Sequence, residues 1–279
     1  MNEKELTLPE EISKVSQMPP RDLVILSIPK AGKGTIFGKF TEQYNAIVLD
    51  LECGGYDYVA ARKISTYPEQ DTTKYESFLN YIKYRNLLLQ NKGKYEYLII
   101  DGVSDLDDLS NIGGTLVYMD SIIGKNFNRV LLPNKTYGDQ YTPEDPEWKS
   151  VLTLPDGAGY QHFRSWFLRQ VEIFKQIAPY RLWAAHIADK YIKDNGKEEV
   201  IGSEIFLTGK LKNIFSSRVT ALAKLIVDGP ERYLNFDVQN DSVLSGSRKP
   251  ELHGRMLISK QLEDGKIETY WNKIYPSKE

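Results

Sequence analysis

The sequence predicts an α/β protein with a mostly parallel central sheet and helices on its faces. Short apolar runs recur along the chain, and segments with helical spacing separate them. Strands that alternate with helices favour parallel pairing, because each helix carries the chain back along one face of the sheet. The predicted strands are 23–26, 46–50, 97–101, 182–186 and 219–227, and the predicted helices are 35–44, 75–91, 157–179 and 210–217.

The last part of the chain has a different pattern. Residues 231–238 and 255–271 resemble antiparallel strands, and Asp264 and Gly265 form a favourable hairpin turn in the second of them. We therefore expect a C-terminal antiparallel hairpin.

Domain organisation follows from composition along the chain. Residues 1–21 are polar and contain three prolines, which predicts an N-terminal leader or linker. Residues 22–279 are long enough for one large domain. Two segments in it, 110–159 and 187–209, do not fit the alternating pattern. We expect long loops there, and loops of this length are usually functional or mobile.

Composition narrows the protein class. The 279 residues carry a net charge of −2, which gives no overall attraction to nucleic acid. Cys53 is the single cysteine, which excludes an internal disulfide and a cysteine-based zinc site. No apolar run has the length of a signal core or a membrane span. We expect a cytoplasmic protein without a membrane partner.

The run SIPKAGKGT, residues 27–35, lies between the first predicted strand and the first predicted helix. It resembles the phosphate-loop pattern G-x-x-x-x-G-K-[ST], with Ser27 at the first glycine position and Gly34 at the Ser/Thr position. In this pattern, Gly32 lets backbone N–H groups approach phosphate oxygens and Lys33 adds a positive charge. The alternative is a surface turn, but the flanking strand and helix favour a phosphate site. The predicted nucleotide-binding residues are Pro29, Lys30, Ala31, Gly32, Lys33, Gly34 and Thr35.

Asp101 ends the predicted strand 97–101. At the carboxyl end of a parallel strand it would lie near the phosphate loop, where it can hold Mg²⁺ through water. Gly34 has no hydroxyl for the metal, so Thr35 is the second predicted metal residue. An ordinary strand-ending aspartate is the alternative for Asp101.

Glu52 and His186 follow two other predicted strands. A carboxylate at such a position can orient and deprotonate a water molecule, which is the role predicted for Glu52. A polar side chain at His186 can contact the γ-phosphate and transmit its loss to the following segment. The alternatives are a solvated acid and a half-buried histidine. For Asp50 a structural role is the better interpretation.

Arg248 and Lys249 lie in the sequence GSRKP, residues 246–250. A basic loop tip can insert charge into the site of a neighbouring subunit. The alternative is a pair of solvated loop charges.

The order of these motifs resembles the RecA-like ATPases. It is most similar to the phage-encoded RecA-like ATP-binding proteins linked to single-strand annealing and recombination. The stretches that carry the resemblance are 23–35, 46–55, 97–106, 182–189, 209–219 and 246–254.

The resemblance implies a role for each candidate residue. Gly32 and Lys33 hold phosphate, Glu52 activates the attacking water, and Asp101 is the Walker B acid. His186 stands where RecA proteins usually carry a glutamine that senses the γ-phosphate.

The resemblance also implies partners. Residues 187–209 match the DNA-facing loop that follows the sensor, and Arg248 and Lys249 match basic residues that act across a subunit interface. We therefore expect ATP, Mg²⁺, single-stranded DNA and a homo-oligomeric ring or filament, in the host cytoplasm if the protein is phage-encoded.

Two other functions remain open at this point. Ser27 and Gly34 depart from the usual phosphate loop, which is compatible with a nucleotide-binding assembly protein that hydrolyses little ATP. The ending G-K-G-T also occurs in nucleoside monophosphate kinases. Those enzymes need several arginines around two nucleotides, and between residues 86 and 163 this chain has only Arg129.

Overall fold

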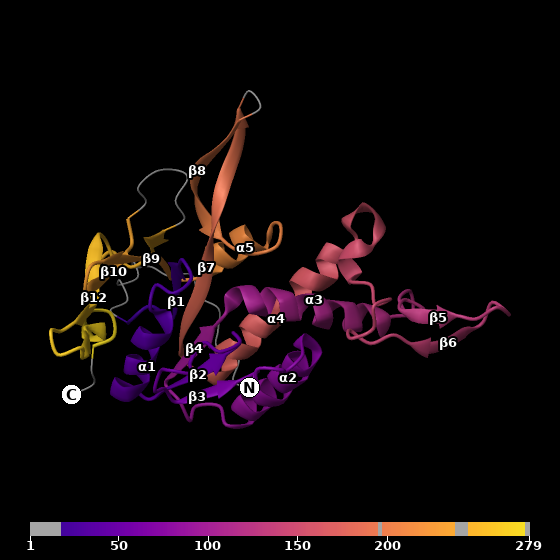
Figure 1. The fold of residues 1–279 in the computed structure, drawn as a ribbon, viewed down its shortest axis with the longest axis horizontal. Coiled ribbons are helices and arrows are strands. Elements are labelled where there is room, and N and C mark those ends of the chain that lie inside the picture. The colour runs from indigo at the N-terminus through magenta and orange to yellow at the C-terminus, as the bar shows by residue number, and fades with distance from the viewer. Residues whose placement is uncertain (1–17, 195–196, 238–244, 277–279) are drawn as a thin grey trace, which may run out of the picture.

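The computed structural model describes residues 18–194, 197–237 and 245–276, and in these residues eleven strands form one sheet (Figure 1). Its order is β13-β12-β10-β9-β1-β7-β4-β2-β3, with β8 paired to β7 and β11 paired to β9. The parallel strands are β1 (Asp22–Ser27), β2 (Ala46–Asp50), β3 (Lys63–Ser65), β4 (Tyr97–Asp101), β7 (Tyr180–Asp194) and β9 (Ala221–Asp228). The predicted mixed α/β fold, with a mostly parallel central sheet and flanking helices, is confirmed.

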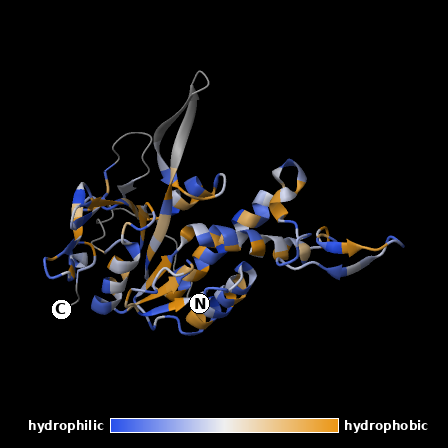
Figure 2. Cartoon of the chain, in the orientation of Figure 1, coloured by the Kyte–Doolittle hydropathy of each residue, from blue (hydrophilic) through white to orange (hydrophobic). Residues whose placement is uncertain are grey.

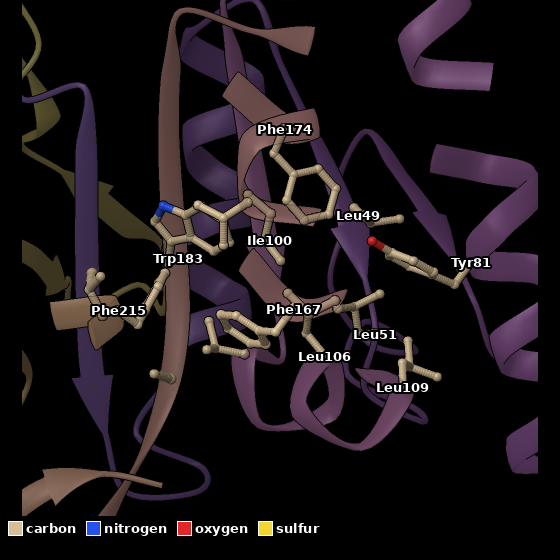
Figure 3. Close-up of a cluster of buried hydrophobic side chains, with 14 of the residues drawn as sticks. Leu49, Leu51, Tyr81, Ile100, Leu106, Leu109, Phe167, Phe174, Trp183 and Phe215 are labelled. Carbon is tan, nitrogen blue, oxygen red and sulfur yellow. The ribbon is translucent and has the colours of Figure 1, made fainter. Parts of the chain in front are cut away.

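Helices cover both faces of the sheet. The helices are α1 (Lys33–Gln43), α2 (Lys74–Gln90), α3 (Val103–Met119), α4 (Gly159–Ile177) and α5 (Leu211–Arg218). Buried side chains of α2 to α5 belong to one apolar cluster, part of which Figure 3 shows, and those of α1 belong to the other. Along β1, Val24 and Leu26 enter the first cluster, whereas Leu23 and Ile25 enter the second. This alternation follows from the two-residue period of a strand, so β1 is apolar on both faces.

The antiparallel part of the sheet extends from β9. It contains β10 (Glu231–Asn235), β12 (Arg255–Gln261) and β13 (Ile267–Thr269), and β11 (Gly246–Ser247) pairs with β9 on a side branch. After β13, a 3₁₀ helix, η3 (Trp271–Lys273), buries Trp271 against α1, where its Nε1 donates to the Ile36 carbonyl at 3.3 Å. Most of the predicted N-terminal leader, residues 1–17, lies outside the described residues.

The segment 187–209 is a paired ribbon over most of its length, so the predicted loop is wrong there. β7 continues past His186 to Asp194 and pairs antiparallel with β8 (Lys197–Ile205). Figure 1 shows this ribbon projecting from the sheet. Its polar sequence lacks the apolar alternation from which a strand is predicted, but the ladder hydrogen bonds do not depend on side chains. The expected turn at Asn195 and Gly196 lies outside the described residues.

The segment 110–159 is also more ordered than a loop. α3 runs to Met119, β5 (Arg129–Leu131) and β6 (Tyr137–Gln140) form a separate two-stranded sheet, and two 3₁₀ helices follow, η1 (Val151–Thr153) and η2 (Pro155–Gly157). A Cβ atom at Gly113 would lie 2.1 Å from the ring of Trp166 on α4. The glycine that made this segment resemble a loop therefore lets two helices approach closely. Within the described residues, no helix has both the length and the apolarity needed to cross a bilayer.

Candidate nucleotide site

The carboxyl ends of neighbouring strands meet at one edge of the sheet. The register pairs Ser27 of β1 with His186 of β7, and it pairs Asp101 of β4 with Asp50 of β2. β7 and β4 are themselves neighbours, so these strand ends form one row. In open α/β sheets, ligands bind in the crevice outside this edge.

The loop between β1 and α1 has the conformation expected of a phosphate site. Gly32 directly precedes the first helical residue and has φ +94°, in the left-handed region that favours glycine. No side chain caps the first turn of α1, so its backbone N–H groups have no side-chain acceptor. Such groups and the positive end of the helix dipole attract anions.

A cleft of about 540 Å³ opens beside this loop. Of the predicted nucleotide-binding residues, six line it, whereas Ala31 is buried in the apolar cluster on the α1 side. Glu52, Asp101 and His186 line the same cleft, so it contains all of the predicted catalytic and metal residues. The lining residues are Pro29, Lys30, Gly32, Lys33, Gly34, Thr35, Glu52, Cys53, Gly54, Gly55, Val59, Asp101 and His186.

Three side chains in the cleft form a continuous polar chain. The Nζ atom of Lys33 lies 3.4 Å from Nδ1 of His186, and Nε2 of His186 lies 3.0 Å from Oε1 of Glu52. A lysine ammonium only donates, so Nδ1 accepts and Nε2 carries the proton that is donated to Glu52. The imidazole thus links the lysine of the predicted phosphate loop to the candidate base.

The surroundings of Glu52 keep it ionised. Burial by itself would raise its pKa, but the hydrogen bond from His186 and the positive charge of Lys33 outweigh that effect, and the pKa of Glu52 lies below its ordinary value. An ionised carboxylate can accept a proton from water, as the role predicted for this residue requires.

Asp101 is buried, with 3% of its surface exposed. Its Oδ2 accepts a hydrogen bond of 2.6 Å from the Tyr56 hydroxyl, whereas its Oδ1 is buried and has no hydrogen-bond partner among the described residues. Burial and then the charge of Glu52 raise the pKa of Asp101 to about 7. A buried carboxylate oxygen without a partner is costly by itself, and a metal ion or metal-bound water would satisfy it.

The two predicted metal residues, Asp101 and Thr35, are compatible with Mg²⁺. Thr35 lies in the first turn of α1 and lines the same cleft as Asp101. In the part of the chain that the structure describes, no three His, Cys, Asp or Glu side chains are grouped to hold a metal by themselves. Mg²⁺ commonly uses one or two carboxylates together with water and substrate phosphates, so this donor set suffices.

Asp50 stabilises the turn that carries Glu52. It is 1% exposed, and its Oδ1 accepts the backbone N–H of Glu52 at 3.2 Å. Burial raises the pKa of Asp50 to about 6, although the hydrogen bonds from Ser65 and from the Glu52 backbone act in the opposite direction. This agrees with the structural role expected for it.

Arg248 and Lys249 lie at the other edge of the sheet. The backbone N–H of Arg248 donates to the Thr220 carbonyl, just before β9, and its guanidinium donates to the Ser217 carbonyl. Nζ of Lys249 is 3.3 Å from the Met18 carbonyl. Within one chain, the structure does not bring either residue to the phosphate loop, so an action on phosphate requires a second copy.

Two residues at the site were missed from the sequence. Tyr56 contacts Asp101, as described above. Arg232 of β10 lies behind the phosphate loop, with its Nε 3.3 Å from the Ala31 carbonyl. Neither has a local sequence signal, because each reaches the site from an element whose position depends on the complete sheet.

A second hollow of about 700 Å³ adjoins the cleft. It shares Pro29, Glu52 and His186 with the cleft and extends between the start of α3 and the segment that follows β8. Burial, and then the charge of Glu52, raises the pKa of Asp105 in this hollow to about 7. Because the two cavities share Glu52 and His186, the hollow is continuous with the cleft on the side of the candidate base.

The sequence matches no protein-family model and no curated protein.

Proposed function

We propose that this protein is a RecA-like ATPase that binds ATP with Mg²⁺ in the cleft and hydrolyses its terminal phosphate. The chain of contacts from Lys33 through His186 to Glu52 carries the proposal. It joins a phosphate-binding charge to a candidate base in a cleft that also contains Asp101. The order of sequence motifs supports the RecA-like assignment.

Binding of the triphosphate uses the loop and the start of α1. The N–H groups around Gly32 point positive dipole ends at the phosphate oxygens, and Lys33 adds a full charge. Asp101 and Thr35 would hold Mg²⁺, which would supply positive charge to the phosphates. Asp101 offers a free, buried Oδ1 for this purpose.

Hydrolysis uses Glu52 and His186. Glu52 accepts a proton from a water molecule while the water oxygen bonds to the γ-phosphorus. The bond from the γ-phosphorus to the β,γ-bridging oxygen breaks, and ADP and inorganic phosphate leave. His186 holds Glu52 in its ionised form and contacts the same lysine that binds phosphate, so it is suited to respond to loss of the γ-phosphate.

We further propose that nucleotide state controls a grip on single-stranded DNA during phage recombination, single-strand annealing or replication, in a homo-oligomer. The supporting observation is continuity, since His186 and the projecting ribbon belong to one strand, β7. The Phe206 N–H, just after β8, also donates to the His186 carbonyl at 3.0 Å. A shift of His186 is therefore passed to both strands of the ribbon.

A second candidate is a nucleotide-binding assembly protein with little hydrolysis. Gly34 favours it, because this position provides no hydroxyl for the metal.

The test is ATP turnover with matched variants. Wild-type protein should hydrolyse ATP in the presence of Mg²⁺ and faster with single-stranded DNA. Glu52→Gln should bind ATP with unchanged affinity but lose at least about 100-fold in turnover, the usual contribution of a general base. Lys33→Ala should lose ATP binding itself. Bound ATP with turnover that is negligible in both wild type and Glu52→Gln would support the assembly protein instead.

A further inference from the structure

Another segment packs closely against Gly34, the position at which the phosphate loop lacks a hydroxyl. A Cβ atom at Gly34 would lie 3.1 Å from the Gly55 carbonyl oxygen, which is tighter than an ordinary contact. It would also lie 3.8 and 3.9 Å from Cε1 and Cζ of Tyr56. The turn after β2 therefore packs directly against the position of a side chain at residue 34.

The same turn brings a different hydroxyl to this place. Cζ is the ring carbon that carries the Tyr56 hydroxyl, and this hydroxyl donates to Oδ2 of Asp101 at 2.6 Å. Tyr56 is 2% exposed, so the bond is shielded from water.

We propose that Tyr56 is a positioning residue for the metal site: from the turn after β2, beside Gly34, its hydroxyl fixes the orientation of the Asp101 carboxylate. By binding Oδ2, the phenol fixes the Asp101 carboxylate with Oδ1 as its remaining acceptor, and Oδ1 has no other partner. Asp101 lines the cleft, whereas Tyr56 lies behind it, so Tyr56 acts through Asp101. This inference rests on the proposed nucleotide and Mg²⁺ site.

A purely structural role for Tyr56 makes a different prediction. Its ring belongs to the apolar cluster on the α1 side, and Tyr56→Phe keeps that ring. If packing alone matters, removal of the hydroxyl changes stability but not metal binding. If the hydroxyl positions Asp101, its removal weakens metal binding more than nucleotide binding.

The experiment measures Mn²⁺ binding by electron paramagnetic resonance in the presence of a non-hydrolysable ATP analogue. Analogue affinity is measured separately in EDTA. Tyr56→Phe should weaken Mn²⁺ binding about tenfold or more, the effect of losing a hydrogen bond to a charged group, with analogue affinity in EDTA unchanged. The matched control is Tyr81→Phe, another buried tyrosine, whose hydroxyl donates to Oε1 of Gln170 at 3.0 Å. It should change neither quantity.

A second variant tests the same idea without altering Tyr56. In Gly34→Ala, the added methyl group meets the Gly55 carbonyl and displaces the turn that carries Tyr56. We expect this variant to bind Mn²⁺ more weakly than the wild type, although alanine stabilises a helix better than glycine does. Thermal unfolding checks that each variant is folded. If Tyr56→Phe does not fold, Mn²⁺ binding by Gly34→Ala tests the proposal.

Two outcomes separate this inference from the proposed function. If Asp101→Asn weakens Mn²⁺ binding but Tyr56→Phe and Gly34→Ala bind Mn²⁺ within about twofold of wild type, the role of Tyr56 is overturned and the metal site stands. If the wild-type protein binds no ATP analogue with or without metal, the proposed function is overturned and this inference with it.

Discussion

Carboxyl groups gather around the candidate site, and their neighbours give them different protonation states. Glu52 has a hydrogen bond from His186 and the positive charge of Lys33 nearby, so its pKa is lowered. Asp101 and Asp105 lie in the same region, but nearby positive charges and hydrogen bonds offset less of the effect of their burial. Burial, followed by the charge of Glu52, raises the pKa of each to about 7. Groups whose pKa values are shifted in different directions by burial and by neighbouring charges cluster at functional sites, which supports a functional site in this cleft.

At the residue scale, Asp105→Asn should stabilise the protein at alkaline pH. The pKa of Asp105 is about 7 in the folded protein against an ordinary value of 3.8. The folded state therefore holds a proton that the unfolded chain releases, and the wild type loses stability as pH rises from about 4 to 7. Asparagine removes this loss, so the variant should gain on the order of 3 kcal/mol at pH 8 and nothing at pH 4. Urea unfolding at both pH values measures this, with the exposed Asp139→Asn as control.

His186 allows a second prediction at this scale. His186→Ala leaves Glu52 and Lys33 without their shared partner. Turnover should fall about 10- to 100-fold, as for a lost hydrogen bond to a charged group, with a smaller change in ATP affinity. Steady-state kinetics of His186→Gln provide the comparison, because glutamine can bond to both neighbours and should retain more activity. Equal kinetics for the two variants would exclude the linking role of His186.

At the element scale, the predictability of each segment depended on how its side chains are buried. β1, β2 and β4 are buried on both faces, so each is a continuous apolar run that is visible in the sequence, and the central strands are coloured as hydrophobic in Figure 2. The ribbon of β7 and β8 has no such apolar pattern beyond His186. Helix α3 contains glycines, which usually favour loops. The contacts of these α3 glycines with α4 are tertiary, so no local sequence pattern predicts them.

The contact between α3 and α4 can be tested through Gly113. Gly113→Ala places a methyl group on the ring of Trp166, where the Cβ distance would be 2.1 Å. We expect a loss of about 1–3 kcal/mol from overpacking, although alanine favours a helix. Trp166→Leu replaces the ring with a smaller side chain and leaves space for the added methyl group. In a double-mutant cycle, Gly113→Ala should therefore cost less stability in the Trp166→Leu background than in the wild type. Additive effects in denaturant unfolding would show that the two residues are not in contact.

At the scale of the whole molecule, the site joins strand ends that are far apart in the chain. The sequence identified Lys33, Glu52, Asp101 and His186, because each follows a recognisable strand or loop. It did not indicate that β7 lies between β1 and β4, which is what brings His186 into contact with both Lys33 and Glu52. Tyr56 and Arg232 escaped prediction for the same reason, since only the assembled sheet brings them to the phosphate loop.

The projecting ribbon of β7 and β8 allows a prediction about how the whole molecule responds to DNA. The register pairs Asp189 with Ser203, so residues 190–202 can be replaced by an Asn-Gly turn that leaves His186 and the base of the ribbon in place. If the ribbon holds single-stranded DNA, this variant should keep ATP affinity and basal turnover but lose stimulation by DNA. The control shortens the other projecting hairpin, by replacing 132–136 between β5 and β6, and should leave stimulation unchanged. Stimulation that survives in the ribbon variant but is lost in the control would assign DNA binding to the tip of the β5–β6 hairpin instead.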